Sequence, residues 1–325
     1  MPGRLLDNAA CRTPFRREDF QLASVTHAKP VEGEFGLAAG LSAYLLWGFL
    51  PILFEMVSWV GAATVVADRT IWTLVLIGGV LMLGGRTAEV QAALRDRRTV
   101  ITMAAAALLL GSNWLIYVYA VDTNNVLEAS FGYFINPLMN VAIGMVLLGE
   151  RQNRWQMVSI AIAVVAIAIQ AVGLGGVPYI AVSLALSFAA YGYFRKIAGV
   201  GSVAGLFIET LVLVPLAVLY LGYTFLRDGG IGPHADPGTL ALLILTGPAT
   251  AAPLLLFNYA VRRLRLTTMG MLQYIAPSIA FILAITLFGE HLNGVRLFSF
   301  GLIWLSLAVY TADSYVRHRI RQRAA

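Results

Sequence analysis

The sequence predicts an all-α integral membrane protein with ten transmembrane helices in two inverted five-helix repeats. Three observations support this fold class: an apolar composition, a series of membrane-length apolar runs, and an internal repeat. Of the 325 residues, 59% are hydrophobic and 12% are charged, whereas a soluble domain has about 25% charged residues. Helices on the surface of a soluble protein need a polar face, which these runs lack. A soluble fold is therefore excluded.

The apolar runs are long enough to cross a hydrocarbon core of about 30 Å. They fall into ten segments, at 36–57, 65–83, 100–121, 126–148, 155–172, 177–194, 203–225, 238–260, 266–288 and 294–316. The first five segments form one repeat (36–172) and the last five form the other (177–316). Residues 1–35 are polar, contain three prolines and lack the apolar region of a signal peptide, so we expect a disordered cytoplasmic leader. Residues 317–325 are expected to be a basic cytoplasmic tail.

The basic residues divide unequally between the two ends of these segments. Twenty of the 23 Lys and Arg fall in the leader, in the tail and in the loops that follow the second, fourth, sixth and eighth segments. Because Lys and Arg near helix ends stay on the cytoplasmic side, both termini are predicted to be cytoplasmic. This topology accounts for the net charge of +6, so no nucleic-acid partner is expected.

The internal repeat aligns residues 113–160 with residues 253–300 without a gap, at an offset of 140. It pairs a Tyr-Ala-Val run, a proline and a Gly-Glu dipeptide, the last at Glu150 and Glu290. Five predicted crossings separate these two glutamates, so Glu150 is expected inside and Glu290 outside. Inverted repeats are typical of secondary transporters whose halves move about a central site. Duplication retained for packing alone is the alternative.

Polar side chains within the apolar runs are candidates for the transport pathway, because each is costly in lipid unless it is paired or faces a cavity. In segment 126–148, polar and small residues recur every fourth position along one ridge, from Glu128 to Gly144. Interhelical packing is an equally open interpretation of Asn113, Asn140 and Gly144. The candidate substrate pathway consists of amides and aromatic residues on four segments: Asn113, Trp114, Tyr117, Tyr133, Asn136, Asn140, Asn258, Gln273 and Tyr274.

Three charged residues are candidates for gating or coupling: Arg69, Glu128 and Glu209. The offset of 140 pairs Arg69 with Glu209 at similar depths from opposite faces, so each is expected to belong to one gate rather than to a direct ion pair. Glu209 is the better candidate for coupling to protons. Arg69 could instead pair with Asp68, and Glu128 could form a capping box with Asn125 at the start of its helix.

Two prolines at equivalent positions, Pro137 and Pro277, are expected to kink their helices, because proline removes a backbone hydrogen bond. No cofactor and no metal site are expected, since the four histidines lack metal-ligand spacing. The one cysteine, Cys11, allows no intrachain disulfide. No phosphate-binding loop is present, so ATP-driven transport is not expected.

Several motifs resemble the RarD proteins, a group of EamA-type permeases in the drug/metabolite transporter superfamily. They are NWLIYVYAV (113–121), LEASFGYFINPLMN (127–140), LGER (148–151), IETLVLVP (208–215), RLRLTT (263–268) and QYIAPS (273–278). The resemblance implies ten helices in two inverted repeats, cytoplasmic termini, a location in the bacterial inner membrane, and a chloramphenicol-related permease. Two positions depart from the family pattern: Asp68 where the family has His, and Asp122 where it tends to Asn.

These observations predict a bacterial inner-membrane secondary transporter, acting as an exporter of small organic metabolites or drugs by alternating access. It is not expected to be an enzyme. Its expected partners are the lipid bilayer, a small-molecule substrate and protons as coupling ion, and a homodimer is compatible with this pattern. The alternative from another class is a polytopic membrane protein without transport activity, either a sensor or a membrane-embedded enzyme. An enzyme would need a reactive pair of polar residues at one depth in the membrane.

Overall fold

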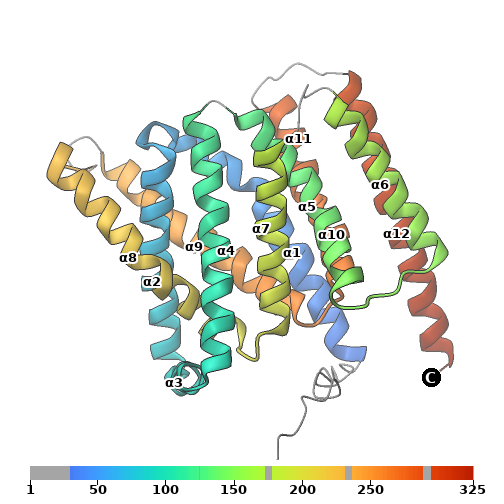
Figure 1. Cartoon of the computed structure of the whole chain (residues 1–325), viewed down its shortest axis with the longest axis horizontal. Coiled ribbons are helices and arrows are strands. Elements are labelled where there is room, and N and C mark those ends of the chain that lie inside the picture. Colours follow the sequence, from blue (N-terminus) through green and yellow to red (C-terminus); the bar gives the residue numbers. More distant parts are fainter. Residues whose placement is uncertain (1–29, 124, 173–177, 231–235, 288–293, 325) are drawn as a thin grey trace, which may run out of the picture.

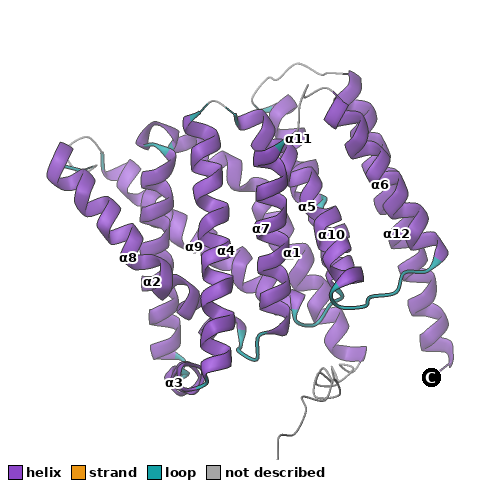
Figure 2. Cartoon of the chain, in the orientation of Figure 1, coloured by secondary structure: helices purple, strands orange, loops and turns teal. Residues whose placement is uncertain are grey.

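The computed structural model describes residues 30–123, 125–172, 178–230, 236–287 and 294–324. This part of the chain consists of helices and their connections, without a strand (Figure 2). Besides the 3-10 turn η2 (Ser58–Val60), the helices are α1 (Pro30–Met56), α2 (Ala62–Leu83), α3 (Thr87–Arg95), α4 (Arg97–Asp122), α5 (Val126–Val146), α6 (Arg154–Val172), α7 (Tyr179–Ile197), α8 (Ser202–Asp228), α9 (Pro237–Val261), α10 (Leu266–Gln273), α11 (Ile275–Thr286) and α12 (Gly294–Ala324).

Nine segments in the described part of the chain are long and apolar enough to cross a membrane. They comprise α1, α2, α4, α5, α6, α8, α9 and α12, together with α10 and α11 as one span. The prediction of a multi-pass, all-helical membrane protein is thus confirmed. The remaining long helix, α7, has 19 residues and carries the basic pair Arg195 and Lys196 in its last turn.

Four helices of the first half begin 140 residues before four helices of the second half. The pairs are α2 and α8, α4 and α9, α5 and α10, and α6 and α12. The equivalence extends to the N-caps of α4 and α9. The Asp96 carboxylate accepts a hydrogen bond from the Thr99 amide at 3.0 Å, and that of Asp236 accepts one from the Thr239 amide at 2.6 Å. The starts of these helices therefore follow the same offset of 140 residues as the sequence repeat.

The main helix contacts also form equivalent sets. Helix α1 packs on α9 and α11, while α7, which stands in the same place of the second half, packs on α4 and α5. Three further pairs join equivalent helices directly, namely α2 with α8, α5 with α10, and α6 with α12 (Figure 1). The start of α1, the short helix α3 and the end of α12 all lie at one end of the bundle (Figure 1).

Segment 266–288, expected as one helix, is divided at Tyr274 into α10 and α11. The physical reason lies at Pro277, which has no amide hydrogen to donate to the Gln273 carbonyl and whose ring crowds that oxygen. Pro137, in contrast, lies inside the continuous helix α5. The helix is thus interrupted before Pro277, whereas α5 continues through Pro137, and the kinks expected at both prolines stay a prediction.

Both ends of the described chain are more helical than expected. Helix α1 already begins at Pro30, within the segment predicted to be a disordered leader, and proline suits a first helical position. The rest of the leader, residues 1–29, lies outside the described residues. Helix α12 continues to Ala324, so the segment from residue 317 is the last part of a helix rather than a separate tail. Glu290 also lies outside the described residues.

Candidate functional site

A fully buried ion pair lies between α7 and α8. Arg195 Nε is 3.3 Å from Glu209 Oε1, and both side chains are completely inaccessible to solvent. The contact between these two atoms is an ion pair without a hydrogen bond. The Tyr191 hydroxyl lies 3.2 Å from Glu209 Oε2 and 3.0 Å from Asn258 Oδ1, so its single proton can serve one of them at a time. We call Tyr191, Arg195, Glu209 and Asn258 the inner cluster.

The inner cluster brings together two residues predicted separately. Glu209 was assigned to gating and Asn258 to the pathway, and Tyr191 links them. Sequence reasoning missed both other members, because Arg195 was counted as a loop charge and Tyr191 as part of an apolar run. The repeat carried a signal for Arg195, since the offset of 140 pairs it with the acidic Glu55.

Aromatic rings pack around the inner cluster. The Tyr191 ring stacks on the Phe257 ring with centroids 5.9 Å apart, and Phe257 also contacts Phe188 at 5.4 Å and Trp47 at 5.6 Å. These side chains come from α1, α7 and α9, so the two halves of the molecule meet here. Both side chains of the ion pair are inaccessible to solvent, which strengthens their electrostatic attraction.

Arg69 lies in a second cluster, in the first half of the chain. Its guanidinium carbon is 4.2 Å from the Trp114 ring centroid and 5.6 Å from that of Phe54. Tyr117 and Tyr133 are close enough to interact electrostatically with Arg69, and their ring centroids are 6.4 Å apart. Four helices, α1, α2, α4 and α5, therefore contribute to what we call the Arg69 cage (Phe54, Arg69, Trp114, Tyr117 and Tyr133).

The Arg69 cage supplies rings but no counter-ion from the described residues. Arg69 Nε is buried without a hydrogen-bond partner, and no ion pair involves this side chain in the described part of the chain. Asp68, the alternative partner considered above, forms no ion pair with Arg69 among the described residues and lines a pocket together with Trp72. These two neighbouring residues of α2 thus have different surroundings. Arg69 lies among aromatic rings of α1 and α4, whereas Asp68 lines a pocket.

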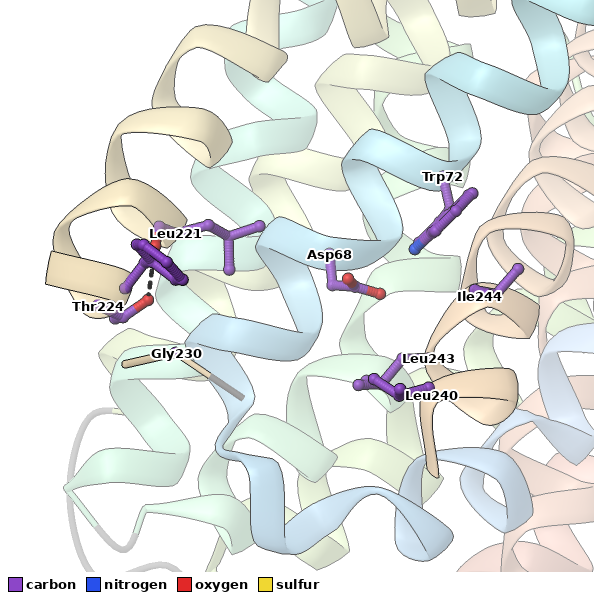
Figure 3. Close-up of a pocket in the computed structure, with 9 residues that line it drawn as sticks. Asp68, Trp72, Leu221, Thr224, Gly230, Leu240, Leu243 and Ile244 are labelled. Carbon is purple, nitrogen blue, oxygen red and sulfur yellow. Dashed lines mark hydrogen bonds between the residues drawn. The ribbon is translucent and has the colours of Figure 1, made fainter. Parts of the chain in front are cut away.

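That pocket, of about 350 Å³, lies between α2, α8 and α9 (Figure 3). Figure 3 shows Asp68 and Trp72 on α2 facing the apolar side chains of α9. Asp68 is the one charged residue among those that line it, and the others are mostly apolar: Trp72, Leu221, Thr224, Phe225, Gly230, Leu240, Leu243 and Ile244. The pocket contains none of the predicted pathway residues.

Much of the ridge on α5 is occupied by helix packing. The Asn140 amide donates to Gln273 Oε1 at 2.7 Å, which joins α5 to α10. Gly132 lies against the backbone of Ala181 on α7, where a Cβ would come within 3.0 Å of the carbonyl oxygen. Gly144 is similarly close to Glu150. For Asn140 and Gly144, the geometry favours the packing interpretation.

Two further candidates also join helices. Asn113 donates through its amide to the Leu184 carbonyl at 2.9 Å and to Ser187 Oγ at 3.0 Å, so it fastens α4 to α7. Glu128 accepts the Ile180 amide at the start of α7 at 2.7 Å. The expected capping box is not formed, because neither Asn125 nor Glu128 caps α5 through its side chain.

Two buried polar atoms on α5 and at the α10–α11 break lack partners in the described part of the chain. Asn136 is 4% exposed and its Oδ1 has no hydrogen-bond partner. Tyr274 is fully buried and its hydroxyl has none either. Since buried polar groups are nearly always hydrogen-bonded, these atoms are available to a bound solute or to a rearranged helix contact.

Glu150 holds the start of α10, a role that the sequence motif did not reveal. Its carboxylate accepts the amides of Leu266 at 2.6 Å and Thr267 at 2.9 Å, and the Thr267 hydroxyl at 2.5 Å. A carboxylate at a helix N-terminus satisfies otherwise unpaired amides and matches the helix dipole. The loop after α5 therefore fixes the entry of the chain into α10.

No group of His, Cys, Asp and Glu side chains suited to a metal ion occurs among the described residues. The inner cluster and the Arg69 cage present charged groups, hydrogen-bonding groups and aromatic rings. Such groups are suited to binding and moving a solute through a low-dielectric interior.

Comparison with known proteins shows the family. Residues 176–312 match the EamA-like transporter family. An uncharacterized transporter of Pseudomonas aeruginosa is 41% identical over 86% of this chain and 94% of its own length. Protein RarD of Salmonella typhimurium is 38% identical over 87% of this chain and 97% of its own. One solved crystal structure shares the fold, with a TM-score of 0.66 at 20% identity over 88% of this chain and 99% of its own. The chain therefore belongs to the EamA-like transporter family, within its RarD group.

Proposed function

We propose that the protein is a secondary transporter of the bacterial inner membrane, which exports small organic metabolites or drugs by alternating access. Family membership supports transport as the general activity. A relative of Pseudomonas aeruginosa, 25% identical to this chain, is named a chloramphenicol-sensitive protein, which supports a drug-like or metabolite-like solute. The single observation that supports the mechanism concerns two charged positions that are equivalent in the two halves. In the described chain, the two charges form an ion pair in the second half but not in the first.

The proposed architecture has ten spans in two inverted halves, with α7 as the tenth span. Support comes from the four helix starts that repeat after 140 residues and from the equivalent contacts of α1 and α7. An odd number of crossings between equivalent helices makes the halves inverted. The clustering of Lys and Arg near α3 and the end of α12 supports cytoplasmic termini.

The difference between the two halves lies in two sets of oppositely charged residues. In the second half Arg195 and Glu209 are paired and buried. The offset of 140 places Glu55 and Arg69 at the equivalent positions, with the signs exchanged. Glu55 is exposed, and no ion pair joins it to Arg69 in the described chain. The inner end is then closed and the outer end open, so we infer an outward-facing state.

Alternating access follows if the ion pair of the second half separates while the equivalent pair of the first half forms. When the inner pair separates, the first half adopts the arrangement of the second, and Glu55 approaches Arg69. Each end is thus closed by one ion pair in turn, at similar depth, since Arg69 and Glu209 are each the eighth residue of their helix. Inverted repeats allow this exchange because each half can adopt the arrangement that the other half has here.

Proton coupling is proposed at Glu209, because protonation would remove the charge that holds Arg195. The test is transport by purified protein in proteoliposomes with and without a pH gradient, comparing wild type with Glu209→Gln. Coupling predicts that the gradient drives wild-type transport and that the variant loses the pH dependence. Unchanged pH dependence in Glu209→Gln would instead favour an uncoupled facilitator.

The substrate is best sought by comparing intracellular and extracellular metabolites of a deletion strain and an overexpressing strain. A transporter predicts reciprocal changes in a few solutes, which purified protein then moves across proteoliposomes. The competing assignment, a sensor or membrane-embedded enzyme, predicts that no solute changes reciprocally, or that a product appears which is absent from the medium and from the deletion strain.

A further inference from the structure

We propose that Arg69 binds the carboxylate of an organic anion that has a flat apolar body, and that the Arg69 cage is the anion-binding end of the substrate pathway. This inference rests on the proposed transport function and names the substrate class of that same pathway. Among the described residues, no carboxylate forms an ion pair with Arg69.

A guanidinium inside a membrane protein normally has a carboxylate or backbone carbonyls as partners. The other deep arginine, Arg195, has Glu209 at 3.3 Å. Arg263 donates to the Tyr259 carbonyl at 3.1 Å. In the described part of the chain, Arg69 has aromatic rings and an unpartnered Nε. Arginine keeps its charge in proteins, so a guanidinium within the membrane interior is stabilised by a partner of opposite sign.

The repeat identifies what that partner should be. At the equivalent site of the second half, the charge pair consists of a guanidinium and a carboxylate, Arg195 and Glu209. In the first half the equivalent carboxylate, Glu55, is exposed at the end of α1. A carboxylate from the solute would therefore complete at Arg69 the pairing that the protein itself completes in the other half.

The rings define the rest of the ligand. Trp114, at 4.2 Å, lies close to the guanidinium and stabilises its charge by cation–π contact. A planar guanidinium offers parallel N–H groups that match a carboxylate better than a neutral amide. Tyr133 is 44% exposed although its ring faces Tyr117, which leaves part of that ring available to a flat apolar group. The surroundings are aromatic rather than basic, which favours one negative charge over a polyanion.

Binding and gating are then competitive, because the ligand carboxylate and Glu55 would use the same guanidinium. The outward-facing arrangement leaves Arg69 free for the solute. Closure of the outer end brings Glu55 to Arg69 and displaces the anion. Removing the charge of Glu55 should therefore strengthen binding of the anion, whereas removing the charge of Arg69 should weaken it.

The experiment measures ligand affinity of the purified full-length protein in detergent, by thermal stabilisation and by calorimetric titration. The probes are matched acids and amides, namely benzoate with benzamide, 3-phenylpropionate with 3-phenylpropionamide, and indole-3-acetate with indole-3-acetamide. At least one acid should bind wild type about tenfold to a hundredfold more tightly than its amide, as expected for charge-assisted hydrogen bonds. Arg69→Gln should remove this preference, and Glu55→Gln should increase the affinity for the acid.

Arg227→Gln is the matched control, since Arg227 is an exposed arginine near the end of α8 and should leave the affinity unchanged. Arg69→Lys keeps the charge without the planar fork and should bind the acid with intermediate affinity. If Arg69→Gln does not fold, the acid-to-amide comparison on wild type and the Arg69→Lys variant still test the proposal.

Three results would overturn the inference: no acid of the panel binding to wild type, equal affinity for acids and amides, or undiminished acid binding by Arg69→Gln. Its failure is distinguishable from failure of the proposed function. If proteoliposomes containing wild type move a neutral solute, and Arg69→Gln moves it equally well, then transport stands and the anion site is wrong. If neither acids nor neutral solutes from the metabolite comparison are moved, the transport function itself is in question.

Discussion

Arg195 on α7 and Glu209 on α8 form an ion pair at 3.3 Å in which both side chains are fully buried. Their equivalents in the first half are Glu55 and Arg69, so the repeat preserves the pair and exchanges its signs. The duplicated sequence thus keeps one acidic and one basic residue at these two positions of each half, although within the described chain only Arg195 and Glu209 form an ion pair.

The first prediction concerns the stability of this ion pair. Arg195→Met should destabilise the protein by ~3–5 kcal/mol, because it leaves the Glu209 carboxylate buried without its counter-ion. The double variant Arg195→Met/Glu209→Leu should recover most of that loss. Unfolding by titration with SDS measures both. A single variant as stable as wild type would show that the pair contributes little to folding.

The second prediction uses Gly205, which lies against the Arg195 guanidinium so closely that a Cβ would overlap it. Gly205→Ala should displace Arg195 and destabilise the protein by ~1–3 kcal/mol, the usual cost of overpacking. Gly222→Ala on the same helix is the control, since nothing lies within 4 Å of a Cβ there. Equal stability of the two variants in SDS titrations would contradict the assigned contact.

The third prediction tests the attachment of α10 to the loop after α5. Glu150→Gln should lower the free energy of unfolding by ~1–3 kcal/mol, because the amides of Leu266 and Thr267 lose a charged acceptor. Hydrogen exchange at the start of α10 should accelerate in the variant, while exchange in α4 stays unchanged. The exposed substitution Asp228→Asn serves as control.

The fourth prediction concerns the equivalent N-caps of α4 and α9. The hydrogen bonds from Thr99 lower the pKa of Asp96, and those from Thr239 lower the pKa of Asp236. A depressed carboxyl pKa stabilises the folded state above the unfolded value of about 3.9, and this contribution is lost as the pH falls through the folded pKa.

Asp96→Ala and Asp236→Ala should therefore each lower the melting temperature at pH 7. This difference from wild type should shrink as the pH is lowered below about 4. Thermal unfolding followed by circular dichroism between neutral and acidic pH measures the effect. A difference that is independent of pH would mean that the charges of the caps do not act on helix stability.

The fifth prediction concerns the exchange of the two ion pairs. In a Cys11→Ser background, Glu55→Cys and Arg69→Cys should form a disulfide when the inner end opens. Adding Glu209→Gln weakens the inner pair, so the yield of the disulfide should rise. Gly222→Ala should leave the yield unchanged. A yield that does not respond to Glu209→Gln would separate the outer positions from the inner pair and contradict the exchange.

Sequence reasoning located Glu209 and Asn258 as separate candidates but missed Tyr191, which lies between them. A tyrosine within an apolar run has no pattern that distinguishes it from ordinary core residues. Asn113 and Asn140 were expected either to line the transport pathway or to join neighbouring helices. Their partners lie on α7 and α10, 71 and 133 residues away in sequence, so packing alone could favour the interhelical interpretation.

The sequence by itself determined that the chain is an all-helical membrane protein, and it contained the offset of 140 that reappears in the helix starts. These properties depend on local features, namely the length of apolar runs, the placement of caps and the spacing of similar residues. Only the tertiary structure decided that Glu209 is paired while Arg69 has no counter-ion among the described residues. Whether a buried charge has a partner depends on how close side chains from different helices come to one another, and that distance is set by packing.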